Sequence, residues 1–258
     1  MTTHLKRTFT LARLRRVFCL VVVAVTAVVV ARIAIGVIVG EGVRVKGSCS
    51  PVTLLTENFD DVTPPALPLD WSSTTWATSN SGAPTPPADT LPNAAFVDDP
   101  ATISDKQLVS PSIFLIEGGE PVQITFRNNF SFQDSFDGGV LEISTDGGNT
   151  FQDILTVGGF ETGGYNGTIS SCCGNPLAGR QVWTGSSGGF VTTTVNLGVK
   201  WGPNMVLRWR MGSDSSVSAE GWRIDSVEIT QCHKPIPTPP TTPRPRPTPH
   251  PRPTRPQH

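Results

Sequence analysis

The sequence predicts an all-β domain, a sandwich or jelly roll, and three observations indicate it. Thr, Val and Ser recur through the middle of the chain, where Ala, Leu, Lys and Glu form no long helical pattern. Short apolar runs alternate with turn signals between residues 50 and 232, a length that suits one domain of ordinary size. About eight short strands joined by long loops are typical of this fold class.

The expected strands are separated by stretches rich in turn-forming residues. Residues 117–121 are a strong turn signal. Residues 62–93 are rich in Pro, Thr and Ser, and we expect a long loop that Trp71 and Trp76 attach to the domain. The Gly- and Ser-rich residues 158–189 are expected to form a surface loop. The strands are expected at 52–59, 94–97, 107–116, 122–132, 139–144, 151–157, 190–197, 206–211 and 222–230.

The last two strands, within residues 204–231, are expected to form a closing hairpin. In the first of them, apolar residues from Leu207 to Met211 alternate with Arg208 and Arg210. This period of two places the apolar side chains on one face of the strand and the charged ones on the other.

The second strand, 222–230, carries apolar residues on both faces. Strict alternation places Trp222 and Ile224 on one face and Val227 and Ile229 on the other. A strand that is apolar on both faces is expected inside a sheet rather than at its edge.

Asp225 lies among the apolar residues of this strand. A carboxylate in such a place needs hydrogen-bond donors or a cation. Three interpretations follow: it accepts hydrogen bonds from loop amides, it pairs with Arg208 or Arg223, or it is a calcium ligand.

The charge is unevenly distributed along the chain. Residues 50–232 contain 20 acidic and 7 basic residues, whereas the segments on both sides are basic. An acidic domain is a poor nucleic-acid binder because phosphate contacts require Lys and Arg, so no nucleic-acid partner is expected. The same charge suits a cation.

The N-terminal region is typical of an export signal. Residues 1–16 form a basic segment that should stay in the cytoplasm, and residues 17–39 are apolar except for interruptions such as Arg32. The apolar segment is either an uncleaved signal anchor, which makes the membrane a partner, or a cleaved signal peptide. Both place the domain outside the cytoplasm, secreted or membrane-anchored.

The C-terminal residues 233–258 contain 11 Pro, many followed by Arg or Thr. Such a segment forms no core or sheet and is expected to be a disordered, semi-rigid polyproline II tail. It is either an inert spacer or a basic tail that lies on an anionic surface.

The cysteines predict disulfides in an oxidising compartment. Cys49 and Cys232 bracket the domain, and a bond between them would join its two ends. Cys172 and Cys173 are adjacent in a Gly-rich stretch. They form a vicinal disulfide, stay free, or each pair with a terminal cysteine.

Catalytic machinery is not recognisable in the domain. Residues 50–232 contain no His, which excludes Ser-His-Asp and Cys-His chemistry and His-bound zinc there. The sequence contains neither a His-Glu-x-x-His motif nor a phosphate-binding Gly-Lys-Ser/Thr loop. Glycoside hydrolysis by paired carboxylates stays open because acids are plentiful.

One turn has a recognisable motif, the Asp box Ser-x-Asp-x-Gly-x-Thr-Phe. Its residues are Ser144, Asp146, Gly148, Thr150 and Phe151. We expect a structural hairpin turn in which Gly takes positive φ, Asp accepts turn amides and Phe closes the base.

Five motifs in order carry a family resemblance: Glu57-Asn-Phe-Asp60, Leu108-Val-Ser-Pro111, Phe136-Asp-Gly-Gly-Val-Leu-Glu-Ile-Ser-Thr-Asp-Gly-Gly148, Leu207-Arg-Trp-Arg-Met-Gly-Ser-Asp214 and Glu220-Gly-Trp-Arg-Ile-Asp-Ser-Val227. Together they resemble the MAM-like domains of secreted bacterial proteins, including the accessory domain of immune inhibitor A metallopeptidases. The resemblance covers roughly residues 52–230.

This resemblance implies an antiparallel jelly-roll sandwich, concanavalin-like or galactose-binding-like, with a non-catalytic binding or adhesion role. It also implies a structural calcium ion. The chain departs from the peptidase in having no protease domain, and Ser226 stands where a second Asp is common. The calcium ligands that the resemblance implies are Glu57, Asp60 and Asp225, with Asp98 and Asp137 as further candidates.

The leading hypothesis is an exported, non-catalytic β-sandwich that binds an extracellular glycan or protein. A first alternative is a structural surface spacer, which predicts no pocket and packs Trp71, Trp76 and Trp183 rather than displaying them. A second alternative is a hydrolase, which requires two carboxylates that face each other across an open cleft.

Overall fold

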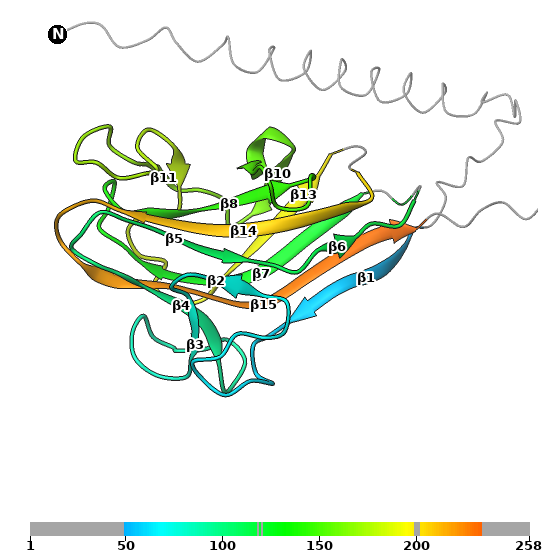
Figure 1. The fold of residues 1–258 in the computed structure, drawn as a ribbon, viewed down its shortest axis with the longest axis horizontal. Helices are drawn as coiled ribbons and strands as arrows, with labels where there is room; N and C mark the ends of the chain where they lie inside the picture. Colours follow the sequence, from blue (N-terminus) through cyan, green and yellow to red (C-terminus); the bar gives the residue numbers. More distant parts are fainter. Residues whose placement is uncertain (1–48, 118, 120, 199–201, 234–258) are drawn as a thin grey trace, which may run out of the picture. The chain divides into compact units, whose positions relative to one another are not determined.

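Two antiparallel sheets packed face to face form the domain, so the predicted all-β sandwich is confirmed (Figure 1). The computed structural model describes residues 49–117, 119, 121–198 and 202–233. The predicted segments 1–16 and 17–39, and the tail beyond residue 233, lie outside the described residues. Within the described part of the chain, no helix is long and apolar enough to cross a membrane.

The first sheet has seven strands in the order β10-β13-β7-β15-β4-β3, with β1 also paired to β15. The long strands β7 and β15 lie in its middle, as expected for a last strand that is apolar on both faces. The strands are β1 (Ser50–Glu57), β3 (Ala77–Ser79), β4 (Ala94–Asp99), β7 (Val122–Ser131), β10 (Gly158–Thr162), β13 (Val191–Leu197) and β15 (Ala219–His233).

The second sheet has six strands in the order β2-β5-β14-β8-β9, with β6 also paired to β14. A separate pair, β11 and β12, lies outside both sheets, and one 3₁₀ turn, η1, follows β9. The elements are β2 (Ser72–Ser73), β5 (Ser104–Val109), β6 (Ile113–Phe114), β8 (Gly138–Ser144), β9 (Gln152–Asp153), η1 (Ile154–Thr156), β11 (Gly167–Thr168), β12 (Gln181–Val182) and β14 (Asn204–Ser213).

Aromatic side chains join the two sheets in the core. Trp209 of β14 meets Phe126 of β7 edge-on, with ring centroids 5.5 Å apart. Trp71 stacks on Trp209 with ring centroids 5.8 Å apart, so the long loop is attached to the core as expected. Trp222 of β15 lies 5.7 Å from Trp183. Such pairs add to the free energy gained by burying apolar area.

The predicted closing hairpin is wrong. β14 pairs with β5, β6 and β8 in the second sheet, whereas β15 pairs with β1, β4 and β7 in the first. The polar stretch between them therefore crosses from one sheet to the other. Two consecutive strands with a polar connection have the same sequence pattern in a hairpin and in such a crossover, and tertiary pairing decides between them.

A β-bulge lies in the middle of β15. The register against β7 shifts between Asp225 and Glu228, and Ser226 has a φ of 49°. One extra residue in a strand reverses the faces of all residues after it.

The bulge corrects the expected orientation of β15. Val227 and Ile229 are buried in the same core as Trp222 and Ile224 rather than on the opposite face. Strict alternation fails here because it assumes an uninterrupted pleat.

Four other expected elements differ from the structure, and one is the expected loop 62–93, which contains β2 and β3. The expected strand 107–116 is interrupted after Val109, because Pro111 separates β5 from β6. The expected strand 151–157 contains only the short β9, followed by η1. The expected surface loop 158–189 contains β10, β11 and β12, and it buries Trp183 in the core.

Arg223 holds the loop of residues 81–87 on the outer face of the first sheet. Its guanidinium donates to the carbonyls of Ser81 (2.7 Å), Ala83 (3.2 Å), Pro84 (3.0 Å) and Pro87 (2.9 Å). The side chain is fully buried, and this burial lowers its pKa to about 10. A Pro-rich segment has few N–H donors to offer a sheet, so side-chain donors attach it instead.

The predicted disulfide between Cys49 and Cys232 is confirmed, and it joins two residues 183 positions apart in sequence. Cys172 and Cys173 form the vicinal disulfide that was one of three alternatives. The first bond lies beside the pairing of β1 with the end of β15, so it closes the domain where its two ends meet.

The Cys49→Ala/Cys232→Ala double variant should lose about 2–5 kcal/mol of unfolding free energy, because the open chain regains the entropy of a very long loop. Urea unfolding of the full chain measures this loss. Cys172→Ala/Cys173→Ala is the control, since a bond between neighbours hardly constrains the unfolded chain. An equal loss in both variants would contradict the explanation.

Replacing Arg223 with Met should cost about 2–4 kcal/mol, because four carbonyls lose their donor. The loop 81–87 should also become a site of limited proteolysis under native conditions. Arg210→Met, which removes a partly exposed ion pair with Asp105 and a more distant contact with Glu142, should cost less than Arg223→Met. Protection of the loop in the Arg223 variant would contradict this role.

Candidate binding cleft

A cleft of about 690 Å³ opens on the outer face of the second sheet. Its floor comes from β5 and β14, and its rims come from the loop before β2, from β6 and from the Asp-box turn. The lining residues are Asp70, Ser72, Gln107, Val109, Ser110, Pro111, Ser112, Phe114, Gly147, Gly148, Phe151, Val206 and Arg208.

Phe114 is the displayed aromatic residue of the cleft, with 72% of its surface exposed. It belongs to the short strand β6, in which Ile113 points into the core and Phe114 therefore points outward. A large apolar side chain beside polar groups is the usual composition of a small-ligand site.

The Asp-box turn forms the opposite rim and has the hairpin geometry expected of it. Asp146 accepts hydrogen bonds from the Ser144 hydroxyl (2.6 Å) and from the amide and hydroxyl of Thr150 (2.9 and 2.6 Å). The Ser144 hydroxyl is the largest cause that holds the pKa of Asp146 well below its usual range. Gly148 takes a φ of 91°, as the expected turn requires.

Phe151 ends this turn and lies beneath Arg208, whose guanidinium carbon is 3.9 Å from the ring centroid. The turn thus places an aromatic ring and a cation on one wall of the cleft. Phe151 was expected only to close the base of the turn, and its role in the cleft depends on its contact with a distant strand.

Glu142 compensates the positive charges of this face. It is buried, and its carboxylate contacts Arg180 (2.5 Å), Arg208 (2.5 Å) and, more distantly, Arg210 (3.6 Å). The Arg208 guanidinium also donates to Gln107 at 3.1 Å. Both Arg208 and Gln107 are therefore held in fixed orientations in the cleft floor.

Two further acids complete the compensation. Asp153 accepts from Arg180 at 2.7 Å, and Asp105 pairs with Arg210 at 2.7 Å. Hydrogen bonding from Arg210 is the largest cause that lowers the pKa of Asp105. Three arginines thus face three acids, and the network is neutral.

Asp225 accepts hydrogen bonds from loop amides, the first of its three interpretations. The amides of Asp89 (2.7 Å), Thr90 (3.0 Å) and Ser226 (2.6 Å) donate to it. Burial raises its pKa to about 6 against the opposing effect of these donors. Among the described residues it forms no ion pair with an arginine.

The other implied calcium ligands near Asp225 are also bound to amide donors. Asp60 accepts from the amide of Asn93 at 2.9 Å, and Glu57 accepts from the amide of Phe59 at 2.6 Å. In the described part of the chain, no three His, Cys, Asp and Glu side chains gather so as to hold a metal ion. Calcium at Glu57, Asp60 and Asp225 therefore stays a prediction.

The further candidates Asp98 and Asp137 have different surroundings. Asp98 is largely exposed and forms an ion pair with Lys106 at 2.7 Å. Asp137 is fully buried, and it lies near Asp99, the residue of β4 that directly follows Asp98. Because side chains alternate along a strand, the two neighbouring acids of β4 point in opposite directions.

The acids at and near the cleft bear on the hydrolase alternative. One carboxylate, that of Asp70, is among the described residues that line the cleft. The neighbouring carboxyl groups of Asp99 and Asp137 are buried, away from any open surface. The geometry that paired-carboxylate hydrolysis requires is two acids across an open cleft.

The spacer alternative made two predictions, with opposite outcomes. Trp71, Trp76 and Trp183 are packed in the core, as the spacer predicts. The cleft contradicts its other prediction. The exposed aromatic side chain is Phe114 rather than one of the three tryptophans. The alternation of Ile113 and Phe114 after Pro111 could have predicted this exposure from the sequence.

No family model matches this sequence, and comparison with curated proteins finds no match. Among solved structures, the CBM22-1 xylan-binding domain from Paenibacillus barcinonensis Xyn10C shares 12% identity with a TM-score of 0.41, covering 71% of this chain and 97% of that domain. The K3 cleaved adhesin domain of Lys-gingipain from Porphyromonas gingivalis shares 17% identity with a TM-score of 0.41, covering 70% and 99%. Likenesses this distant carry no inference about the ligand.

Glu142→Gln should destabilise the domain by about 2–3 kcal/mol, less than for a deeply buried pair because the three arginines are partly exposed. Urea unfolding of the full chain measures the loss. Glu161→Gln, an exposed acid outside the cleft, should change the unfolding free energy by less than about 0.5 kcal/mol. Equal effects in the two variants would contradict the role of Glu142.

Proposed function

We propose that this chain is an exported, non-catalytic module that binds a neutral extracellular glycan through the cleft on its second sheet. The observation that carries the proposal is Phe114, an exposed ring at the edge of a cleft with polar side chains. The apolar face of a sugar ring packs on an aromatic ring, while its hydroxyls bond to fixed polar groups.

The polar groups of the cleft suit hydroxyls. Gln107 and Arg208 are oriented by their mutual hydrogen bond, and Asp70 and Ser72 stand on the rim. Hydroxyls both donate and accept, so a mixture of amide, guanidinium, carboxylate and hydroxyl groups can satisfy them. Because fixed groups lose little entropy on binding, their orientation favours affinity.

The charge of the cleft favours a neutral ligand. Arg208 is the cation of the cleft lining, and Glu142 already compensates it. A sulfated or uronic acid-rich polymer would need a cation with no such partner. An acidic domain also repels polyanions at long range.

Export is supported by the N-terminal sequence and by the cysteines. The basic residues 1–16 and apolar residues 17–39 are those of a signal anchor or signal peptide. Disulfides persist in oxidising compartments outside the cytoplasm. The resemblance to MAM-like domains also agrees with a non-catalytic binding role, and under this proposal the domain is secreted or membrane-anchored.

Phe114→Ala should weaken glycan binding at least about tenfold, a loss of about 1.4 kcal/mol. The full chain is tested for retention on insoluble xylan, cellulose, chitin and peptidoglycan, and the retained pair is titrated. Since Phe114 is exposed, the variant should unfold at the same temperature as the wild type.

The matched control is Leu91→Ala, which removes another exposed apolar side chain, 78% exposed, outside the cleft lining. It should leave binding unchanged. Equal weakening in both variants would place the binding elsewhere. Wild-type chain that no polysaccharide retains would reject the glycan function and favour a protein ligand or a spacer.

A further inference from the structure

The loop between β11 and β12 carries the vicinal disulfide on its exposed surface. Cys172 and Cys173 are both exposed, and so are the residues directly before and after them. The other disulfide differs, because Cys232, the partner of Cys49, has only 5% of its surface exposed. A reductant in solution can therefore approach the vicinal disulfide more freely, and exposed disulfides are the labile ones.

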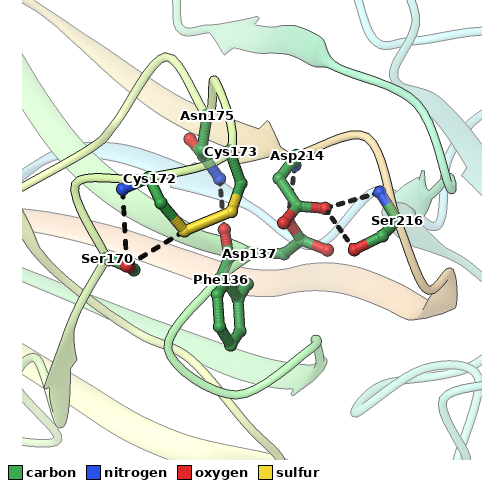
Figure 2. The surroundings of a disulfide bond; sticks show 8 residues. All are labelled: Phe136, Asp137, Ser170, Cys172, Cys173, Asn175, Asp214 and Ser216. Atoms are coloured by element: carbon green, nitrogen blue, oxygen red, sulfur yellow. Dashed lines mark hydrogen bonds between the residues drawn. A yellow bond between two sulfur atoms is a disulfide. The ribbon is translucent and has the colours of Figure 1, made fainter.

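Hydrogen bonds fix the loop on both sides of this disulfide (Figure 2). Before it, the amide of Ser170 donates to the carbonyl of Ser135 at 2.8 Å. After it, the Asn175 side chain donates to the carbonyls of Phe136 (2.6 Å) and Gly212 (2.9 Å). Because these contacts do not involve the sulfur atoms, opening the disulfide would leave the loop attached and the domain folded.

Ser170 lies against one sulfur of the pair. Its hydroxyl donates to Cys172 Sγ at 3.3 Å and accepts from the amide of Cys172 at 3.4 Å (Figure 2). A disulfide sulfur is a weak acceptor, whereas a thiolate is charged, so this hydrogen bond becomes stronger when the S–S bond breaks. A thiol that is stabilised as a thiolate leaves faster, and Ser170 therefore makes Cys172 the better leaving group.

The fold protects the two disulfides unequally. Cys49–Cys232 joins residues 183 positions apart and so stabilises the folded state, and by the same linkage the folded state resists its reduction. Attack on the exposed Cys49 would also expel a thiolate at the buried Cys232, which burial disfavours. A bond between neighbours has almost no such linkage. In addition, Cys173 takes a φ of 72°, a left-handed conformation that costs energy in residues other than glycine.

We propose that Cys172–Cys173 is a thiol–disulfide exchange site that a dithiol reductant opens selectively, with Ser170 as a positioning residue. A thiolate of the reductant attacks Cys173 Sγ and forms a mixed disulfide, and the electron pair of the broken S–S bond goes to Cys172 Sγ. The second thiolate of the reductant then attacks its own sulfur in the mixed disulfide and releases Cys173.

The net reaction transfers two electrons from the reductant to the protein. The dithiol becomes a disulfide, and its two protons end on the two cysteines. The product is a folded domain with two adjacent thiols on one exposed loop. The proposal does not rest on the glycan function.

The test is reduction of the full chain under native conditions, in a mild detergent, after the remaining cysteine, Cys19, has been blocked with iodoacetamide. Dithiothreitol is added, samples are trapped with N-ethylmaleimide, and mass spectrometry of the peptides follows each cysteine. Cys172 and Cys173 should be labelled at least about tenfold faster than Cys49 and Cys232. While only this pair is open, the unfolding temperature should stay at its wild-type value.

Ser170→Ala should slow the opening about two- to tenfold, which is the effect of one hydrogen bond to the leaving sulfur. Ser170→Thr keeps a hydroxyl and should keep the wild-type rate. Ser171→Ala is the matched control, because Ser171 is a neighbouring exposed serine whose hydroxyl, among the described residues, bonds to neither sulfur. It should open at the wild-type rate.

Equal rates of opening for the two disulfides would overturn the proposed site, and so would unfolding of the domain as the vicinal pair opens. Equal rates in Ser170→Ala and Ser171→Ala, or a slow Ser170→Thr variant, would overturn the role of Ser170. Should Ser170→Ala fail to fold, the difference between the two disulfides of the wild type decides.

Discussion

The bulge at Ser226 is the constraint on which much of the domain depends. It lets one strand, β15, bury Trp222 and Ile224 before it and Val227 and Ile229 after it in a single core. Upstream of the bulge, the outward face of β15 carries two buried charged side chains, the Arg223 guanidinium and the Asp225 carboxylate. These two groups attach the long Pro-rich loop through its carbonyls and its amides respectively, so core and loop are fixed by the same strand.

The outer face of the second sheet is organised by a network of charged side chains. Its outer face carries Arg208 and Arg210 of β14, Arg180 reaches it from the segment before β12, and the buried Glu142 contacts all three. Because each arginine is paired with an acid, the surface has oriented hydrogen-bond donors and no net charge. Such a surface suits hydroxyl groups better than anions, which is the basis for proposing a neutral ligand. The two faces of the sandwich therefore differ: the first sheet holds the Pro-rich loop, and the second carries the cleft to which we assign binding.

The end of the sandwich where the chain crosses from β14 to β15 differs from both faces. The buried Asp137 and Asp214 lie there, beside the loop that contains the vicinal disulfide (Figure 2). The Cys49–Cys232 disulfide is a covalent link in the first sheet, where it joins β1 to the end of β15.

The sequence by itself determined the all-β class and the Asp-box turn, because these depend on local periodicity, composition and a short motif. It also indicated the pairing of Cys49 with Cys232, because these cysteines bracket the domain, and the attachment of Trp71 and Trp76, because they are large apolar residues in a Pro-rich loop. Tertiary structure decided which strands pair, so the expected hairpin of β14 and β15 became a crossover. It also decided that Phe114 and Phe151 share a cleft and that Asp99, rather than Asp98, lies near Asp137. These contacts join residues far apart in the chain, and a single inserted residue such as Ser226 changes which side chains meet, so no local pattern encodes them.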